Sequence, residues 1–329
     1  MQTPQVPGPW PALRACALLG TVFLGSAVSA EISYDDHAAR LERIAVDGGT
    51  LAYMDIGPED APALLLIHGV PTSSYLFREV GPMIAEGGYR VIAPDLLGAG
   101  ASDKPVEPGV YAPDRQAARL VELMDAEGLD GAVVVLHDVG GVTGWQLLQN
   151  APDRIDGLVV TNTVNGMQGV TPAPMVMPIM SGQATPRDVF GGLGDGDAAL
   201  DATREWMDMG YPGEETAPDA LVEIYAGPLR DGGAEAYVQF FEAAIPAFMG
   251  GEAARRDAQA AFDGPTAIVF GTQDKYFDAD VIVPDFQAAL GTPDEAITLI
   301  PEAGHFLQEQ TPEAYADAIL AFMEANFPR

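Results

Sequence analysis

Residues 133–141 read VVVLHDVGG, and this stretch decides the fold. An apolar run typical of a buried strand ends in a turn whose tip carries Asp138, and two glycines then open a helix. Glycines permit a sharp strand-to-helix turn and close packing of the helix. The pattern therefore predicts a nucleophile elbow. An aspartate can serve as its nucleophile, because a carboxylate can attack a tetrahedral carbon without a base to activate it. The alternative is an aspartate that only caps the helix beginning at Gly140.

Two downstream segments bear on that choice. Residues 266–274 form an apolar strand that runs into a turn ending in Asp274. Residues 296–305 form a strand whose following loop delivers His305 beside a glycine. A nucleophile, an acid and a histidine in this chain order, each after a strand, predict a catalytic triad with Asp138 as its first member.

A fourth segment precedes the elbow. Residues 63–71 read as a strand followed by a loop, HGVP, at its C-terminal end. In an acyl-transfer type of site, two backbone N–H groups hold the oxygen that becomes negative in the tetrahedral intermediate. We expect the N–H groups of Val70 and Val139 to form this oxyanion hole.

Composition and charge limit the function classes. The chain has 329 residues, of which 48% are hydrophobic and 19% charged, enough for one large core with an insertion. Its net charge of −32 is spread along the chain, so nucleic acid and anionic lipid are excluded as partners. Four histidines and a single cysteine form no ligand cluster, so neither a metal nor an organic cofactor is expected.

The N-terminal segment has the features of an export signal. Residues 15–28 are apolar but too short to span a membrane, and Val28 and Ala30 suit the cleavage positions. We expect a secretory signal peptide over residues 1–30, a periplasmic or secreted location, and no membrane contact after cleavage. A retained N-terminal anchor is the alternative. Cys16 lies in this segment, so the mature chain would have no cysteine for a disulfide or for thiol catalysis.

Apolar runs and amphipathic segments alternate along residues 31–164, the predicted first part of the core. This alternation predicts an α/β fold with a mostly parallel sheet and helices on both faces. Two short strands, residues 40–47 and 50–56, begin it and are joined by a glycine turn. Further strands are expected at residues 63–68, 89–94, 132–137 and 158–163, and helices at residues 73–86, 114–127 and 142–149.

The alternation stops near Asn165, after the sixth core strand. Residues 165–250 hold many glycines, prolines and methionines and predict a helical cap of several short helices, residues 198–209 and 218–226 among them. Seven of the 12 methionines fall there, which indicates either an adaptable pocket for a small apolar substrate or loose packing of the cap. The core resumes over residues 251–329, with strands at 266–270 and 297–300 and helices at 281–290 and 313–327.

At this point the sequence resembles the haloalkane dehalogenase and epoxide hydrolase group of α/β-hydrolases. The resemblance covers most of residues 32–164 and 264–329, and the segments PTSSYL and ASDKP are closest to haloalkane dehalogenases. It is carried by residues 68–78 (HGVPTSSYLFR), 95–105 (DLLGAGASDKP), 137–141 (HDVGG) and 304–309 (GHFLQE). The resemblance implies a hydrolase that acts at sp³ carbon through a covalent ester on Asp138, with water as the second substrate and Asp274 and His305 completing the triad.

The positions that would bind a leaving halide depart from the dehalogenase pattern. Dehalogenases usually have tryptophan directly after the nucleophile, and many have asparagine in the oxyanion loop. Here these positions are Val139 and Val70, whose side chains cannot donate a hydrogen bond. Trp145 and Trp206 remain as indole donors, and Trp206 is expected either to face the site from the cap or to pack between helices.

The epoxide hydrolase alternative needs phenols in the cap to protonate the opening oxygen. The candidates are Tyr211, Tyr225 and Tyr237, and Phe241 stands where one such phenol aligns. Each of them could instead pack inside the cap. A dehalogenase-like hydrolase is therefore the leading hypothesis, an epoxide hydrolase the second, and a ligand-binding member of the fold without turnover the third. The sequence indicates no particular oligomeric state.

Overall fold

The computed structural model describes residues 32–329, and Tyr34–Arg329 forms one compact unit. The predicted signal peptide, residues 1–30, lies outside the described residues. Among the helices of the described part, none is long and apolar enough to cross a membrane.

A single eight-stranded sheet forms the centre of this unit, in the order β1-β2-β4-β3-β5-β6-β7-β8. The pairs from β4 to β8 are parallel, whereas β1 and β2 join as an antiparallel edge. The predicted mostly parallel sheet is confirmed, since apolar strands covered on both faces are the pattern that parallel sheets require. The strands are β1 Glu42–Val46, β2 Gly49–Ile56, β3 Ala63–Ile67, β4 Arg90–Pro94, β5 Ala132–Asp138, β6 Ile155–Thr163, β7 Thr266–Gly271 and β8 Ile297–Ile300.

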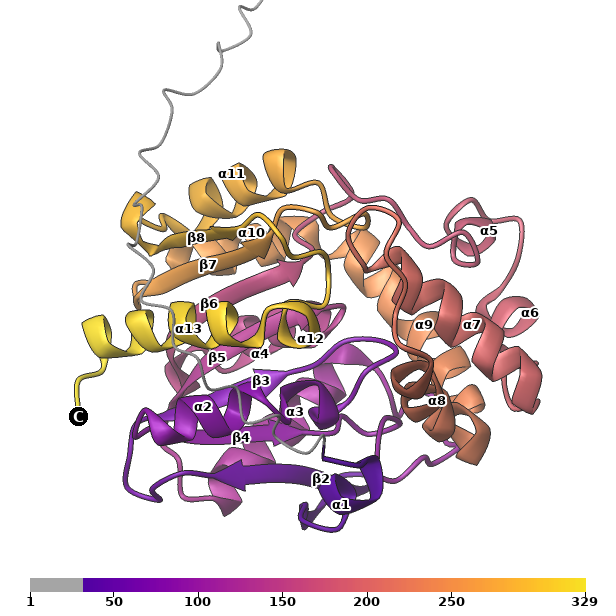
Figure 1. The fold of residues 1–329 in the computed structure, drawn as a ribbon, viewed down its shortest axis with the longest axis horizontal. Coiled ribbons are helices and arrows are strands. Elements are labelled where there is room, and N and C mark those ends of the chain that lie inside the picture. The colour runs from indigo at the N-terminus through magenta and orange to yellow at the C-terminus, as the bar shows by residue number, and fades with distance from the viewer. Residues whose placement is uncertain (1–31) are drawn as a thin grey trace, which may run out of the picture. The chain divides into compact units, whose positions relative to one another are not determined.

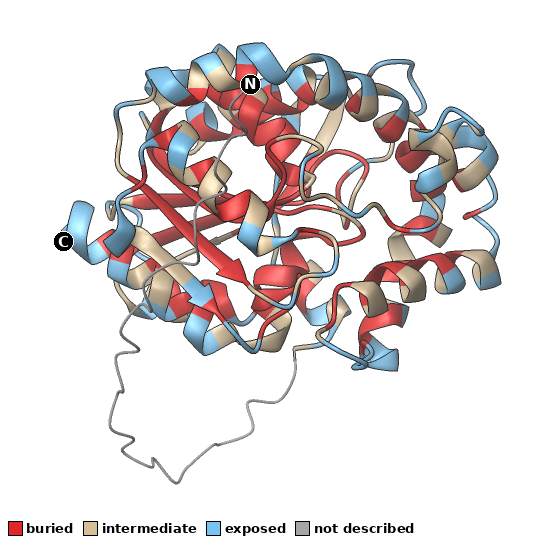
Figure 2. Ribbon diagram, turned by 90° about the horizontal axis from the view of Figure 1, so that it is seen from above, coloured by how far each residue is buried: buried red, intermediate tan, exposed pale blue. Residues whose placement is uncertain are grey.

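Helices cover both faces of the sheet (Figure 1). Strands β3 to β7 are buried along nearly their whole length, whereas the edge strands β1 and β8 are more exposed (Figure 2). One face carries α2 (Val80–Glu86), α12 (Leu307–Gln310) and α13 (Pro312–Asn326). The other carries α3 (Pro113–Ala126), α4 (Gly140–Asn150) and α11 (Ala279–Leu290), with α10 (Glu252–Ala261) packed on α4 and α11.

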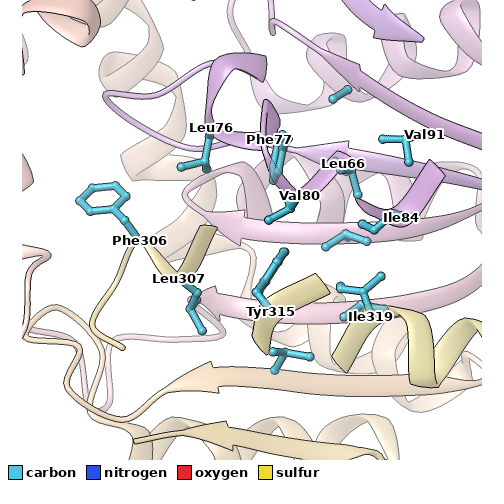
Figure 3. Packing of buried hydrophobic residues seen from close by; sticks show 14 of the residues in the cluster. Leu66, Leu76, Phe77, Val80, Ile84, Val91, Phe306, Leu307, Tyr315 and Ile319 are labelled. Carbon is cyan, nitrogen blue, oxygen red and sulfur yellow. The ribbon is translucent and has the colours of Figure 1, made fainter. Parts of the chain in front are cut away.

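Interdigitated apolar side chains hold the first of these faces to the sheet. Val80 and Ile84 of α2 lie with Tyr315 and Ile319 of α13 in one layer over Leu66 of β3 (Figure 3). All five side chains are fully buried, and each such burial contributes roughly 1.5–3 kcal/mol to folding.

The segment at residues 73–86, predicted as one helix, is two elements. A 3₁₀ turn, η1 (Ser74–Phe77), is followed by α2, which begins only at Val80. Pro82 supplies the reason, because it has no N–H and is tolerated only in the first turn of a helix, where N–H groups need no partner. A continuous helix would have placed it in the interior.

The helical insertion follows β6 and precedes β7, as predicted, and lies beyond the C-terminal ends of the parallel strands (Figure 1). The expectation of short helices alone is wrong for α9, which is 17 residues long. The cap boundaries at residues 165 and 250 stay a prediction. The helices of the insertion are α5 Met177–Met180, α6 Pro186–Phe190, α7 Gly196–Met209, α8 Asp219–Pro228 and α9 Ala234–Gly250, with a π turn, η3, at Leu229–Gly233.

Three further short elements complete the description. They are α1 Tyr34–Ala38 and two 3₁₀ turns, η2 Pro152–Arg154 and η4 Asp294–Ala296.

Candidate active site

The strand β5 ends in a strained turn at Asp138. Its φ of 51° lies in the left-handed region, which is uncommon for residues with a side chain and which clusters at functional sites. The next helix approaches so closely that a Cβ at Gly140 would lie 2.2 Å from the His68 carbonyl oxygen. A Cβ at Gly141 would lie 2.1 Å from Thr163 Oγ1, and this hydroxyl donates to the Asp138 carbonyl. The glycines therefore allow the elbow geometry that the sequence predicts.

Backbone N–H groups from two segments face the Asp138 carboxylate. The Val70 N–H donates to Asp138 Oδ2 at 2.8 Å, and the Val139 N–H also hydrogen-bonds the carboxylate. The two groups predicted to form an oxyanion hole are thus at one carboxylate, which is only 7% exposed. The geometry suits a negative charge on an oxygen of the carboxylate or of a tetrahedral intermediate formed at its carbon.

His305 lies between two carboxylates. Its Nδ1 is 2.8 Å from Asp274 Oδ2, and its Nε2 is 3.5 Å from Asp138 Oδ1. Asp274 follows β7 and His305 follows β8, so the C-terminal ends of three parallel strands bring the predicted triad together. This arrangement fixes the imidazole by its Nδ1 side and leaves Nε2 facing the elbow.

The charges in this site shift the pKa values of His305 and Asp138. Burial alone would lower the pKa of His305, but the charge of Asp274 and hydrogen bonds to both carboxylates outweigh it and raise the pKa to about 10. Burial alone would raise the pKa of Asp138, but its hydrogen bond to His305 and the charge of His305 lower it. At neutral pH the site therefore holds an ionised Asp138 beside an imidazolium.

Asn162 is a site residue that the sequence analysis missed. Its Nδ2 donates to Asp274 Oδ2 at 2.7 Å, and its Oδ1 accepts the Gly271 N–H at 2.8 Å. Asp274 Oδ1 accepts the N–H groups of Tyr276 and Phe277 at 2.7 and 3.2 Å. The carboxylate is therefore held on both oxygens. The available signal was a polar residue near the end of an apolar strand.

His137, next to the elbow aspartate, is fully buried. Its Nε2 lies 3.0 Å from the His305 carbonyl oxygen, which makes Nε2 the protonated nitrogen. Burial and the neighbouring His305 charge lower its pKa to about 4, so it is neutral at ordinary pH. This contact ties the backbone of His305 to β5 and gives His137 a structural role beside the elbow.

A cavity of about 130 Å³ opens over the carboxylate and the imidazole. Its wall is almost entirely apolar. The ionisable side chains that line it are those of Asp138, His305 and Tyr276. Met167 and Met180 of the methionine-rich insertion contribute to it, as one of the two hypotheses for these methionines requires. Its other lining residues are Val70, Val139, Val142, Val164, Val170, Thr171, Pro172, Ala173, Val176, Trp206, Phe240, Phe241, Ala244, Ile245, Phe248 and Phe277.

The cap residues singled out in the sequence separate into two groups. Trp206 and Phe241 line the cavity, and Tyr237 lines a smaller one of about 30 Å³ that shares Val70 and Val139 with it. Trp206 also packs on Phe190 and Tyr237, so it faces the site and packs between helices at once.

Tyr211 and Tyr225 lie apart from both cavities. The Tyr225 hydroxyl donates to Glu309 at 2.8 Å, and the Tyr211 ring packs near Phe306. Tyr276, which was not predicted, lines the main cavity, but its hydroxyl donates to the Trp206 carbonyl at 2.7 Å. Within the described part of the chain, no group of three or more His, Cys, Asp or Glu side chains is arranged to hold a metal.

Comparison with protein families gives a match to a family model described as the alpha/beta hydrolase fold, over residues 62–190. A haloalkane dehalogenase from Mycobacterium marinum is 29% identical over 278 residues, which cover 82% of this chain and 87% of that protein. A haloalkane dehalogenase from Psychrobacter cryohalolentis is 27% identical over 297 residues, which cover 83% of this chain and 87% of that protein.

Two solved structures extend the comparison. Haloalkane dehalogenase DbeA from Bradyrhizobium elkani has a TM-score of 0.71 at 26% identity, covering 87% of this chain and 97% of that one. A putative epoxide hydrolase from Pseudomonas aeruginosa has a TM-score of 0.71 at 24% identity, covering 87% and 95%, and this likeness shows the fold alone. Together the comparisons confirm the predicted fold class and the predicted resemblance.

Proposed function

We propose that this chain, a hydrolase of the α/β-hydrolase fold with haloalkane dehalogenases among its homologues, displaces a leaving group from sp³ carbon through a covalent ester on Asp138. One observation carries the proposal. Asp138 Oδ2 is held by the Val70 N–H at 2.8 Å, while Oδ1, the oxygen we assign as the attacking atom, lies 3.5 Å from His305 Nε2. A small haloalkane suits the apolar cavity above this carboxylate.

In the first step, Asp138 Oδ1 attacks the carbon in line with the leaving group. A carbon–oxygen bond forms, the carbon–halogen bond breaks, and the halide leaves with the electron pair. The charge of Asp138 disappears in this step. Because that charge helps to raise the pKa of His305, its loss lowers the pKa and favours release of the proton that His305 carries.

In the second step, neutral His305 takes a proton from water, and the oxygen of that water attacks Cγ of the ester. The N–H groups of Val70 and Val139 hold the resulting oxyanion; losing one such donor typically costs about 3 kcal/mol in the barrier. The intermediate collapses, the bond between Cγ and the oxygen of the alkyl group breaks, and His305 gives the proton to that oxygen as the alcohol leaves. Asp274 keeps the Nδ1 proton of His305 in place throughout.

Trp206 is the proposed donor to the departing halide. The Trp145 indole N–H donates to the Val164 carbonyl at 2.9 Å and is therefore occupied. The Trp206 indole lines the cavity and donates no hydrogen bond to any described residue. With one indole donor and two valines in the usual donor positions, we expect iodide and bromide to leave more readily than chloride.

The test is halide release from n-butyl chloride, bromide and iodide. We expect release from the iodide and the bromide by the wild type, none by Asp138→Ala, and at most a trace by Asp138→Asn, whose amide is a far poorer nucleophile. The absence of release from all three by folded wild type, or release that survives in Asp138→Ala, would contradict the proposal.

Epoxide hydrolysis is the second candidate, favoured by one specific observation. The side chain of Tyr237 is buried, its hydroxyl has no hydrogen-bond partner among the described residues, and burial and the charge of Asp138 raise its pKa. A phenol in that setting can donate to an opening epoxide oxygen. Diol formation from styrene oxide by the wild type and its loss in Tyr237→Phe would support this candidate. The third candidate, a binding protein without turnover, predicts that neither substrate class modifies Asp138.

We also propose export to the periplasm or the medium, with residues 1–30 removed, because of the apolar segment and its small-residue cleavage site. The mass of the protein isolated from the periplasm tests this, and a mass that retains residues 1–30 would contradict cleavage.

A further inference from the structure

The C-terminal end of α7 in the cap lies directly against the loop that carries His305. Gly210, the C-cap residue directly after α7, has a carbonyl oxygen that accepts two hydrogen bonds. The His305 N–H donates to it at 2.7 Å, and Gln310 Nε2 donates to it at 3.0 Å. The cap therefore binds the backbone of the residue that acts as the base in the proposed mechanism.

Gln310 joins this cap carbonyl to the histidine loop through its other side-chain atom. Gln310 Oε1 accepts the N–H of Gly304, the residue before His305, at 2.7 Å. The approach leaves no spare room, because a Cβ at Gly304 would lie 2.4 Å from the Gly210 oxygen. A Cβ at Gly210 would lie 3.2 Å from the His305 Cβ. The amide of Gln310 thus spans the junction between cap and loop.

The same helix end also contacts the loop of the acid. The Tyr276 hydroxyl donates to the Trp206 carbonyl at 2.7 Å, and the backbone N–H of Tyr276 donates to Asp274 Oδ1 at 2.7 Å. One end of α7 therefore receives hydrogen bonds from both loops that supply the histidine and the acid. Trp206 itself faces the cavity from this helix end.

We propose that the C-terminal end of α7 holds the His305 loop in position and that Gln310 is a positioning residue for His305. In this arrangement the cap covers the substrate and also fixes the position of His305, and so it determines the rate of the hydrolytic step. The inference rests on the proposed function in one respect. Alkylation needs the carboxylate of Asp138 and a donor to the leaving halide but no base, whereas hydrolysis needs His305 Nε2 aimed at a water over Cγ. Removing the hydrogen bonds of Gln310 should therefore slow hydrolysis of the ester and leave the rate of alkylation nearly unchanged.

Two variants of Gln310 and one control separate these steps. Gln310→Ala removes both hydrogen bonds, and Gln310→Glu keeps the acceptor for Gly304 but sets a carboxylate against the Gly210 carbonyl. Gln149→Ala is the matched control, because Gln149 is also half-buried and donates to a main-chain carbonyl, at 2.9 Å, but within α4.

Rapid mixing with n-butyl iodide and intact-mass analysis would follow both steps. We expect both Gln310 variants to alkylate Asp138 within about twofold of the wild-type rate, and the ester to hydrolyse about tenfold more slowly or worse, so that butylated enzyme accumulates. The control should match the wild type in both steps. Equal losses in alkylation and hydrolysis in the Gln310 variants would overturn the positioning role.

A second readout needs no substrate. The Nδ1 proton of His305, held by Asp274, gives a downfield proton resonance that reports the position of the ring. We expect this resonance to shift or broaden in both Gln310 variants and to stay unchanged in Gln149→Ala. An unchanged resonance in folded Gln310 variants would overturn the inference. A changed resonance in a protein whose wild type no haloalkane alkylates would overturn the proposed function and still support the positioning role.

Discussion

Asn162 and Asp274 are joined by a hydrogen bond of 2.7 Å, from Asn162 Nδ2 to the same Oδ2 that accepts from His305. Asn162 adopts a φ of 30°, which is unusual for a residue with a side chain. The strain is offset by the contacts of its amide, whose oxygen accepts the Gly271 N–H at 2.8 Å. A neutral amide donor at this point satisfies the Asp274 carboxylate oxygen without adding a charge that would compete with His305.

We expect Asn162→Ala to slow hydrolysis of the alkylated enzyme about tenfold, because the acid no longer holds the imidazole in one orientation. The free energy of unfolding should fall by about 1–3 kcal/mol, since the Gly271 N–H loses its partner. Single-turnover kinetics and urea denaturation measure the two effects. Asn165→Ala is the control: Asn165 is equally buried but bonds Gln259 and Asp285, so stability should fall while hydrolysis keeps its rate. Equal rates in wild type and Asn162→Ala would contradict a role for this amide.

Trp206→Phe should slow alkylation about tenfold, because it removes the indole N–H and keeps an aromatic ring against Phe190 and Tyr237. The loss should be greater for n-butyl chloride than for the iodide, since the poorer leaving group depends more on a donor. Burst kinetics of halide release measure it. Trp145→Phe serves as the control, because its N–H is bonded to the Val164 carbonyl; it should reduce stability and leave alkylation unchanged. Identical losses for chloride and iodide would argue against Trp206 as the donor.

His305→Ala should release one halide per active site and then stop, because only the water step needs a base. Intact-mass analysis after incubation with n-butyl iodide should find one butyl group on the protein, and peptide mapping should locate it on Asp138. Continued turnover by this variant at a rate close to that of the wild type would be incompatible with the proposed mechanism.

Stability should depend on pH through His305. Its pKa is raised from 6.5 to about 10 in the folded protein. The folded state therefore holds a proton that the unfolded state loses above its own pKa, so the stabilisation is complete below about pH 6.5 and is lost as the pH rises through about 10. We expect the difference in free energy of unfolding between wild type and His305→Gln to shrink over this window. Urea denaturation at a series of pH values measures it, and a difference that grows with pH would contradict the assignment.

Much of the core was predictable because its strands are apolar runs buried on both faces. The strand expected at residues 132–137 is observed as Ala132–Asp138, and the loops after the seventh and eighth strands bring Asp274 and His305 to that strand's end. Parallel strands explain this success, since their C-terminal ends meet at one edge of the sheet.

Other features depend on contacts that no local pattern reveals. Asn162 bonds a residue 112 positions away, so only its unusual place in an apolar strand distinguished it. The length of α9 could not be read from the sequence, because Pro246 is normally disfavoured in a helix interior. It is tolerated in this helix, which Val238 and Phe241 bury against the rest of the cap. The hydrogen bond from the His305 N–H to the Gly210 carbonyl likewise joins segments far apart in the sequence, so no local pattern predicts it.

The source of the oxygen in the product tests the covalent ester on Asp138 most directly. A single turnover of n-butyl iodide, with enzyme in excess, would be run in water enriched in oxygen-18. Because water attacks Cγ of the ester, we predict that the label enters the Asp138 carboxylate and that the butanol of this first turnover carries unlabelled oxygen from the enzyme. Labelled butanol together with an unlabelled Asp138 would mean direct attack by water on the substrate, and would contradict the mechanism.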